Sequence, residues 1–230
     1  MGHIQLNHAV VRARTGEGDV VILQPTTLDL TEHRIALIGA NGSGKSTLAR
    51  LVNGLAEPTE GTVVVDGLDV SEHGAEVRRR VAFAFTDPAA QLVMPTAAED
   101  VALSLRRTHR DKKERRSAAI EVLRRFGLAE LADRSVHTLS GGQRQLLALA
   151  GVLATDPSIL VADEPTTLLD LANTQLVGDL LFDLEQQLLL VTHDLDLALR
   201  CDRALVIDDA RVVFDGDPDQ AVAFYRRSLV

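Results

Sequence analysis

One glycine-rich segment has the residue types and spacing needed to hold the phosphates of a nucleotide. Residues 39–46 read GANGSGKS and fit the pattern G-x-x-x-x-G-K-[ST] at every fixed position. Small residues let such a loop wind so that its N–H groups point at phosphate oxygens, and the helix that follows adds the positive end of its dipole. Lys45 would reach the β- and γ-phosphates, and the Ser46 hydroxyl would bind Mg²⁺. The segment therefore predicts a P-loop.

Two adjacent carboxylates could supply metal and water chemistry. Asp163 and Glu164 end the mostly apolar run 158–164, SILVADE. A carboxylate at the C-terminal end of a strand can hold Mg²⁺ directly or through water, as P-loop enzymes require. Neighbouring residues on a strand point to opposite faces, so we expect Glu164 to point differently from Asp163 and to act as the base that polarises water.

A second glycine turn precedes an apolar helix. Residues 139–145 read LSGGQRQ, and the apolar run 146–154 follows and stops ahead of Pro157. A Ser-Gly-Gly turn at a helix start forms a second anion site, because the first N–H groups of the helix point outward. The chain is therefore expected to carry two phosphate-binding helix ends.

With these motifs in this order, the sequence resembles the ATP-binding subunits of ABC transporters, whose signature motif is LSGGQ. The resemblance covers nearly the whole chain: Walker A at 39–46, the signature at 139–143, Walker B at 158–164, a D-loop at 167–170 and a switch histidine at His193. It implies ATP and Mg²⁺ as cofactors, ATP hydrolysis by Glu164, His193 and Lys45, and metal contacts from Ser46, Asp163 and Thr86. The residues that it assigns to nucleotide binding are Gly39, Asn41, Gly42, Ser43, Gly44, Lys45, Ser46, Thr47, Ser140, Gly142 and Asp170.

In that family two subunits pack head to tail, and the Walker A motif of one faces the signature of the other. The resemblance therefore implies a homodimer, or a heterodimer with a similar ATPase, in which Ser140 and Gly142 complete the partner's site. Residues 85–92, FTDPAAQL, further resemble energy-coupling-factor (ECF) and cobalt-importer ATPases. That branch implies a membrane scaffold subunit, a substrate-binding membrane subunit, a micronutrient cargo such as biotin, cobalt or nickel, and a place at the cytoplasmic face of the membrane.

Two positions depart from the family pattern. Thr86 stands where the Q-loop glutamine is usual, and its shorter side chain is expected to weaken metal sensing and slow basal turnover. Gln91 is too far along the chain to be assumed a substitute. Ala13 stands where an aromatic ring usually stacks on adenine, which leaves Arg12 or Arg14 as cation–π candidates or as solvated side chains. We therefore expect weak discrimination between ATP and other nucleoside triphosphates.

The elements that must position these residues alternate between strands and helices. Short apolar, β-branched runs predict strands, several of them buried in a parallel sheet: 34–39, 62–66, 80–85, 159–163, 188–192 and 203–208. The segments 3–11 and 211–214 alternate more and are expected to be antiparallel edge strands. Residues 87–154 have helical character. The fold expected is α/β, a P-loop NTPase of the ABC ATPase type with a mixed sheet, in which 1–86 and 155–230 form the nucleotide-binding core and 87–154 a helical subdomain.

Composition narrows the partners. The chain has 24 Lys plus Arg against 33 Asp plus Glu, a net charge of −9, and only 3% aromatic residues. Both features argue against nucleic acid as a partner, since binding it needs basic faces and stacking platforms. The apolar runs are shorter than the ~20 residues of a membrane helix, so membrane association is expected through a partner.

One segment inverts the sign of the charge. Residues 106–116 hold seven Lys or Arg and two acids. This pattern is typical of a solvated helix laced with ion pairs, although a patch facing acidic lipids or an acidic partner is the alternative. A soluble, non-transport ABC ATPase, such as a cofactor-assembly protein, remains the second function that the sequence allows.

Overall fold

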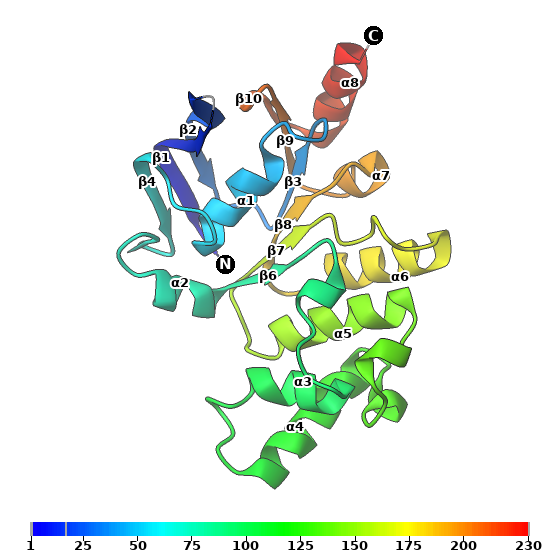
Figure 1. Cartoon of the computed structure of the whole chain (residues 1–230). Helices are drawn as coiled ribbons and strands as arrows, with labels where there is room; N and C mark the ends of the chain where they lie inside the picture. The colour runs from blue at the N-terminus through cyan, green and yellow to red at the C-terminus, as the bar shows by residue number, and fades with distance from the viewer. Residues whose placement is uncertain (1, 17, 230) are drawn as a thin grey trace. The chain divides into compact units, whose positions relative to one another are not determined.

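The computed structural model describes residues 2–16 and 18–229, and these form two compact units (Figure 1). We call them the core unit and the helical unit. The core unit takes in residues 2–16, 18–82, 158–164 and 182–229, and the helical unit takes in residues 83–157 and 165–181. The predicted subdomain 87–154 lies inside the helical unit. Residues 83–86, 155–157 and 165–181, which the sequence assigns to the core, group with the helical unit.

A six-stranded sheet forms the centre of the fold. Its strand order is β10 (Arg211–Gly216), β9 (Arg203–Asp208), β3 (Arg34–Ile38), β8 (Gln187–Val191), β7 (Ile159–Asp163) and β6 (Val81–Ala84). Strands β7, β8, β3 and β9 run parallel, and β10 pairs antiparallel with β9 at the edge. Every residue of β3, β7 and β8 is buried, as their unbroken apolar sequences require. The functional motifs follow the C-terminal ends of these buried strands.

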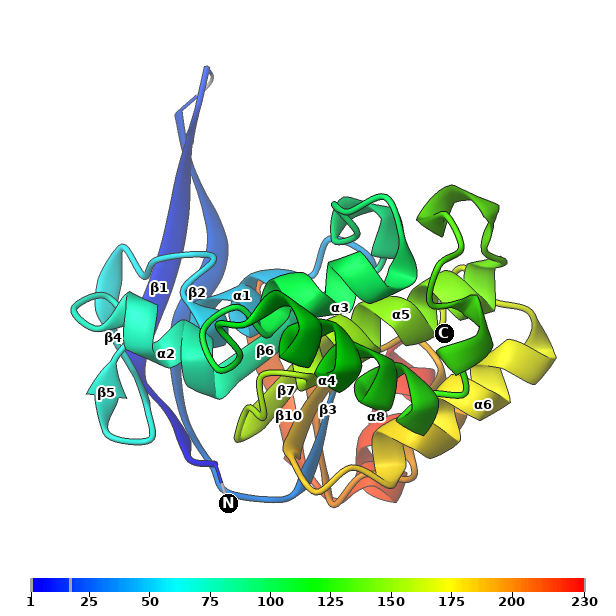
Figure 2. The same ribbon diagram turned by 90° about the horizontal axis from the view of Figure 1, so that it is seen from below.

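A second, antiparallel sheet has the order β2 (Gly18–Leu30), β1 (Ile4–Thr15), β4 (Glu60–Val65) and β5 (Leu68–Asp69). Figure 2 shows β1 and β2 running on together beyond β4, whose pairing with β1 ends at the Val10–Glu60 pair. The expectation that 3–11 forms an edge strand is wrong, because β1 lies between β2 and β4. Strand β2 was not predicted, since its second half, QPTTLDL, is polar and contains Pro25.

The helices of the core unit are α1 (Lys45–Asn53), α2 (Gly74–Arg80), α7 (Leu195–Ala198) and α8 (Pro218–Ser228). Helix α1 packs against β7 and β8, and α7 packs against β3. The buried side of α1 is Leu48, Ala49, Leu51 and Val52, and this apolar stripe holds the helix start beside the ends of the parallel strands.

The helical unit contains α3 (Ala97–Ser104), α4 (Lys112–Arg125), α5 (Gly141–Leu153), most of α6 (Leu171–Phe182) and three short 3₁₀ turns, η1 (Pro88–Ala90), η2 (Ala129–Leu131) and η3 (Val136–Thr138). Helix α3 packs against α4 and α5, with Val101, Leu123 and Leu147 fully buried. Among the described residues, no helix combines the length and hydropathy that crossing a membrane requires.

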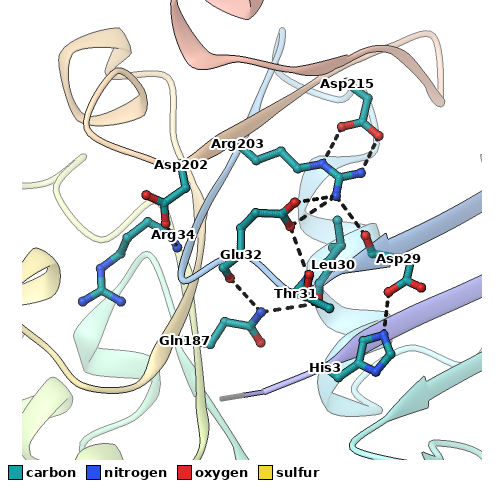
Figure 3. Close-up of polar contacts among 10 residues, drawn as sticks. All are labelled: His3, Asp29, Leu30, Thr31, Glu32, Arg34, Gln187, Asp202, Arg203 and Asp215. Atoms are coloured by element: carbon teal, nitrogen blue, oxygen red, sulfur yellow. Dashed lines mark hydrogen bonds and ion pairs between the residues drawn. The ribbon is translucent and has the colours of Figure 1, made fainter.

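A polar cluster ties the two sheets of the core unit together at the end opposite the motifs (Figure 3). Arg203 at the start of β9 donates to both carboxylate oxygens of Asp215 on β10, at 2.6 and 2.7 Å, and to Glu32 at 3.0 Å. The hydrogen bond to Asp215 is the main reason that the pKa of Arg203 is raised. Gln187 donates to the carbonyl oxygen of Glu32 at 2.8 Å. These bonds hold the turn between β2 and β3. Strand β3, which leads into the glycine-rich loop, starts at this turn.

Candidate functional site

The glycine-rich loop connects β3 to α1 in a shape that only glycine adopts readily. Gly39, Gly42 and Gly44 have φ angles of 147°, 80° and 108°. A Cβ atom on Gly39 would overlap the carbonyl oxygen of Ile207, and one on Gly44 would lie 2.9 Å from that of Ile22. The positive φ angles, and at Gly39 and Gly44 the close approach of carbonyl oxygens, therefore account for these glycines.

Lys45 is folded back over this loop. Its Nζ donates to the carbonyl oxygens of Gly39 and Ala40, both at 2.8 Å. Burial lowers the pKa of Lys45, whereas the nearby charges of Glu164 and Asp163 raise it. A hollow of about 260 Å³ opens here, and it is lined by Ile22, Asn41, Gly42, Gly44, Lys45, Ser46, Thr47 and Glu164. Phosphate oxygens in this hollow would compete with the two carbonyls for the ammonium group.

Two further features of the loop fit an anionic ligand. Helix α1 begins after Gly44, and no described side chain caps its first N–H groups. The Ser43 hydroxyl is buried and has no hydrogen-bond partner among the described residues. Unsatisfied polar groups of this kind are costly unless a ligand or water pairs with them. The loop thus offers donors where the sequence predicts phosphates.

Ser46 and Asp163 meet at the start of α1 and the end of β7. The Ser46 hydroxyl donates to Asp163 Oδ1 at 2.8 Å, and Arg50 Nη2 lies 3.9 Å from Asp163 Oδ2. Burial raises the pKa of Asp163, and the Ser46 hydrogen bond and Arg50 oppose that shift. A hydroxyl beside a carboxylate is a donor set that suits Mg²⁺, which takes its other ligands from phosphates and water. The pair therefore fits the implied ion.

Glu164 comes directly after β7 and has a φ of 53°, in the left-handed region. Its amide donates to the carbonyl oxygen of Val191, at the end of β8, at 2.9 Å. We predicted that strand alternation turns Glu164 away from Asp163, but this reason was wrong because the strand has already ended. The strained turn redirects the side chain, which is a typical feature of functional sites.

The Glu164 carboxylate contacts the predicted switch histidine. His193 Nδ1 lies 2.7 Å from Glu164 Oε2, with the Glu164 side chain 14% exposed and the His193 side chain 58% exposed. A histidine that holds a carboxylate through Nδ1 presents Nε2 as its second polar atom. The pair can therefore orient a base with one ring nitrogen and contact a phosphate with the other.

In the helical unit, Ser140 caps α5. Its Oγ accepts from the amide of Gln143 at 3.2 Å, and Gln143 Oε1 accepts from the amide of Ser140 at 3.0 Å. These two bonds form a capping box. Asp170 caps α6 by accepting from the amide of Asn173 at 2.8 Å. Ser140, Gly142 and Asp170 thus lie in the helical unit, whereas the phosphate loop, Asp163, Glu164 and His193 lie in the core unit.

Thr86 also lies in the helical unit, and its metal role remains a prediction. Gln91 is not available as its substitute. Its Oε1 accepts from the amide of Phe85 at 3.3 Å, and its Nε2 donates to the carbonyl oxygen of Ala148 on α5 at 3.1 Å. The glutamine in the FTDPAAQL segment therefore links the chain just before Thr86 to the signature helix.

The two arginines that the sequence offers for stacking on the base lie on the antiparallel sheet. Arg12 pairs with Glu60 at 3.2 Å, and Arg14 lies 3.7 Å from Asp19. Both arginines therefore have acidic partners on the antiparallel sheet. Ile22, on β2, lines the phosphate-loop hollow and was missed by the sequence reasoning. Nothing in the sequence singled out Ile22, because strand β2, in which it lies, was not predicted.

The basic segment is not laced with ion pairs, so that expectation was wrong. Among the described residues, only Arg116 of its seven basic side chains pairs with an acid, Asp133, at 2.6 Å. Arg115 instead donates to the carbonyl oxygens of His109 and Arg110. Asp111 uses its carboxylate to cap α4, and these backbone hydrogen bonds lower its pKa. Its position in the segment serves the helix rather than charge neutralisation.

Comparisons with known proteins bear on the whole chain. The family model described as "ABC transporter" matches residues 23–167. The biotin transport ATP-binding protein BioM of Rhizobium etli is 44% identical over 209 residues, which cover 91% of this chain and 93% of BioM. The dimeric ATP-binding cassette MJ0796, solved in a post-hydrolysis state with ADP and Pi, has a TM-score of 0.84 at 30% identity and covers 94% of this chain and 98% of its own. CbiO1 of Clostridium perfringens, part of the CbiONQ transporter complex, has a TM-score of 0.82 at 28% identity, covering 96% and 90%.

Proposed function

Since the chain belongs to the ABC transporter family and is an ATPase that binds ATP with Mg²⁺, we propose that it is the ATP-hydrolysing subunit of an ECF-type importer. In this proposal two copies, or this chain and a similar ATPase, form a dimer at the cytoplasmic face of the membrane. The dimer serves a membrane scaffold subunit and a substrate-binding membrane subunit that import a micronutrient, either biotin or a cobalt or nickel ion.

The contact between Glu164 and His193 carries the catalytic part of the proposal. Glu164 Oε2 lies 2.7 Å from His193 Nδ1, beside a hollow that the phosphate loop also lines. In this arrangement Glu164 accepts a proton from the attacking water, His193 holds that carboxylate in place, and Lys45 binds the phosphate oxygens. Bound Mg²⁺, held by Ser46 and Asp163, would neutralise charge that develops on the phosphates.

The likeness to BioM and CbiO1 supports the importer part, together with the segment 85–92. In this chain Asp87 caps η1 by accepting from the amide of Ala89 at 2.9 Å, and Gln91 spans from Phe85 to Ala148. These bonds give the segment a fixed shape that exposes Ala89 and Ala90. A rigid, small-residue surface of this kind suits close packing against a helix of a membrane subunit.

Co-purification tests this proposal. The tagged protein is extracted from membranes in mild detergent, and its partners are identified by mass spectrometry. We expect two integral membrane proteins, and uptake of labelled biotin or of Co²⁺ by vesicles that contain the complex. Recovery with soluble partners alone would contradict the proposal and favour the cofactor-assembly alternative.

A further inference from the structure

Asn173, in the first turn of α6, touches two of the residues that the signature and D-loop motifs predict to be functional. Its Nδ2 donates to Asp170 Oδ1 at 2.9 Å, and its main-chain amide donates to the same oxygen at 2.8 Å. One oxygen of the Asp170 carboxylate therefore accepts hydrogen bonds from both the main-chain and the side-chain N–H groups of Asn173. Because a carboxylate only accepts hydrogen bonds, the side-chain amide must present its nitrogen to Asp170.

The other end of the Asn173 side chain lies against the signature. A Cβ atom on Gly142 would overlap Asn173 Oδ1, and its distance to Nδ2 would be 3.1 Å. Gly142 is buried and does not have a positive φ, so its backbone conformation is open to other residues. A side chain at position 142 would therefore have to displace the amide of Asn173.

We propose that Asn173 is a positioning residue that couples Asp170 to the signature helix, so that a shift of either moves the other. This proposal rests on the proposed function, since Ser140, Gly142 and Asp170 act there on the nucleotide of a second subunit. The coupling is mechanical: one end of the amide is bonded to the Asp170 carboxylate, and the other packs on Gly142 within the first turn of α5.

The surroundings of Asn173 allow it to be replaced without breaking the fold. Asn173 borders a groove of about 480 Å³ that Ser140, Gln143, Leu176 and Leu180 also line. Asn173→Ala therefore removes the amide beside an open groove. Asn173→Asp keeps the shape but cannot donate to Asp170. Gln175→Ala is the matched control, because Gln175 is an exposed polar residue on the same helix.

The first readout is hydrogen exchange of the single chain, which does not depend on dimer formation. We expect the hydrogen-bonded amides of Gln143 and Arg144 to exchange faster in Asn173→Ala and in Asn173→Asp, and to be unchanged in Gln175→Ala. Equal exchange in all proteins would overturn the coupling itself. If the unmodified protein neither dimerises with ATP nor hydrolyses it, the proposed function fails, and this exchange result still decides the coupling.

The second readout is ATP-driven dimerisation in a Glu164→Gln background, measured by analytical ultracentrifugation, together with kcat in the otherwise native chain. Asn173→Ala is expected to weaken the dimer and to lower kcat, each by about tenfold, while ATP affinity of the single chain stays within about twofold. Adding Asn173→Ala to Asp170→Ala should cost little more. Additive losses, or a wild-type dimer and kcat in Asn173→Ala, would overturn the proposed role.

Discussion

The two helix starts that the sequence marks as anion sites differ in how their first N–H groups are used. Helix α1 follows Gly44, which is in the left-handed region, and no described side chain caps it. Helix α5 follows Ser140, whose hydroxyl and amide both take part in the capping box with Gln143. A phosphate at α1 meets open donors, whereas one at α5 must first compete with a side chain of the same protein. A glycine-rich helix start is therefore not by itself a phosphate site.

This difference implies a division of work. The core unit holds the open helix start, the metal pair Ser46 and Asp163, and the Glu164–His193 contact. The helical unit holds Gly142 together with Ser140 and Asp170, whose side chains accept hydrogen bonds from neighbouring amides. We expect the core unit to bind nucleotide in a single chain, and the helical unit to contribute only when it faces a second subunit.

The largest effect is expected at the base. Glu164→Gln should lower kcat by about 10²–10⁴-fold, because it removes the group that accepts a proton from water. ATP affinity should be retained, since the phosphate loop is unchanged. The check is steady-state phosphate release beside equilibrium ATP binding. A kcat within tenfold of the native value would show that another group is the base, and would leave the core unit without its assigned chemistry.

The two helix starts should differ in how much they contribute to ATP binding by the single chain. Lys45→Ala should weaken ATP binding to the single chain by about 10–100-fold, because a hydrogen-bonding charge is lost from the hollow. Ser140→Ala should leave that affinity unchanged, although loss of the cap costs about 1 kcal/mol of stability. Isothermal titration calorimetry and thermal melts measure both. Equal losses of affinity in the two variants would abolish the proposed division.

A smaller effect concerns the base of the nucleotide. With Ala13 at the position where an aromatic ring is expected to stack, ATP and GTP should compete nearly equally at equal concentrations. Ala13→Tyr should raise ATP affinity by about tenfold through stacking. The measurement is displacement of a fluorescent nucleotide. Strong ATP preference in the native chain would mean that the core unit recognises adenine through groups other than a stacked ring.

The smallest effect is expected at Thr86, in the helical unit. Thr86→Gln should raise the apparent Mg²⁺ affinity and the basal ATPase rate a few-fold, because the longer side chain can reach the metal ion or a water bound to it. A Mg²⁺ titration of the ATPase rate provides the test, with Asp87→Asn as the neighbouring control. If both quantities stay at the native values, Thr86 does not limit metal sensing.

The local parts of the fold and site could be predicted from the sequence. The phosphate loop, its flanking β3 and α1, and the strand that ends at Asp163 depend on short stretches with strong backbone demands. Strand β2 could not be recognised, because its partners β1 and the loop at Ala210 compensate for a polar sequence with Pro25 in it. An element could be predicted only where the residues that stabilise it lie close to it in the sequence.

Contacts between distant residues explain the rest of the errors. Asn173 gave no signal, since its significance comes from Gly142, which lies in another helix. The prediction of ion pairs within 106–116 was wrong because Arg115 donates to a backbone carbonyl and Arg116 pairs with Asp133, which lies outside the segment. The orientation of Glu164 was inferred from strand alternation, but a left-handed turn sets it.

The central claim is that a complete site needs the core unit of one copy and the helical unit of another. The variants Lys45→Ala and Ser140→Arg, each shown by circular dichroism to be folded, should have almost no ATPase activity alone. Mixed in equal amounts, they should regain up to about a quarter of native ATPase activity, because half of the dimers are mixed and each mixed dimer has one intact site. Activity that stays at the sum of the two separate variants, while the mixed dimer is shown to form, would contradict the claim.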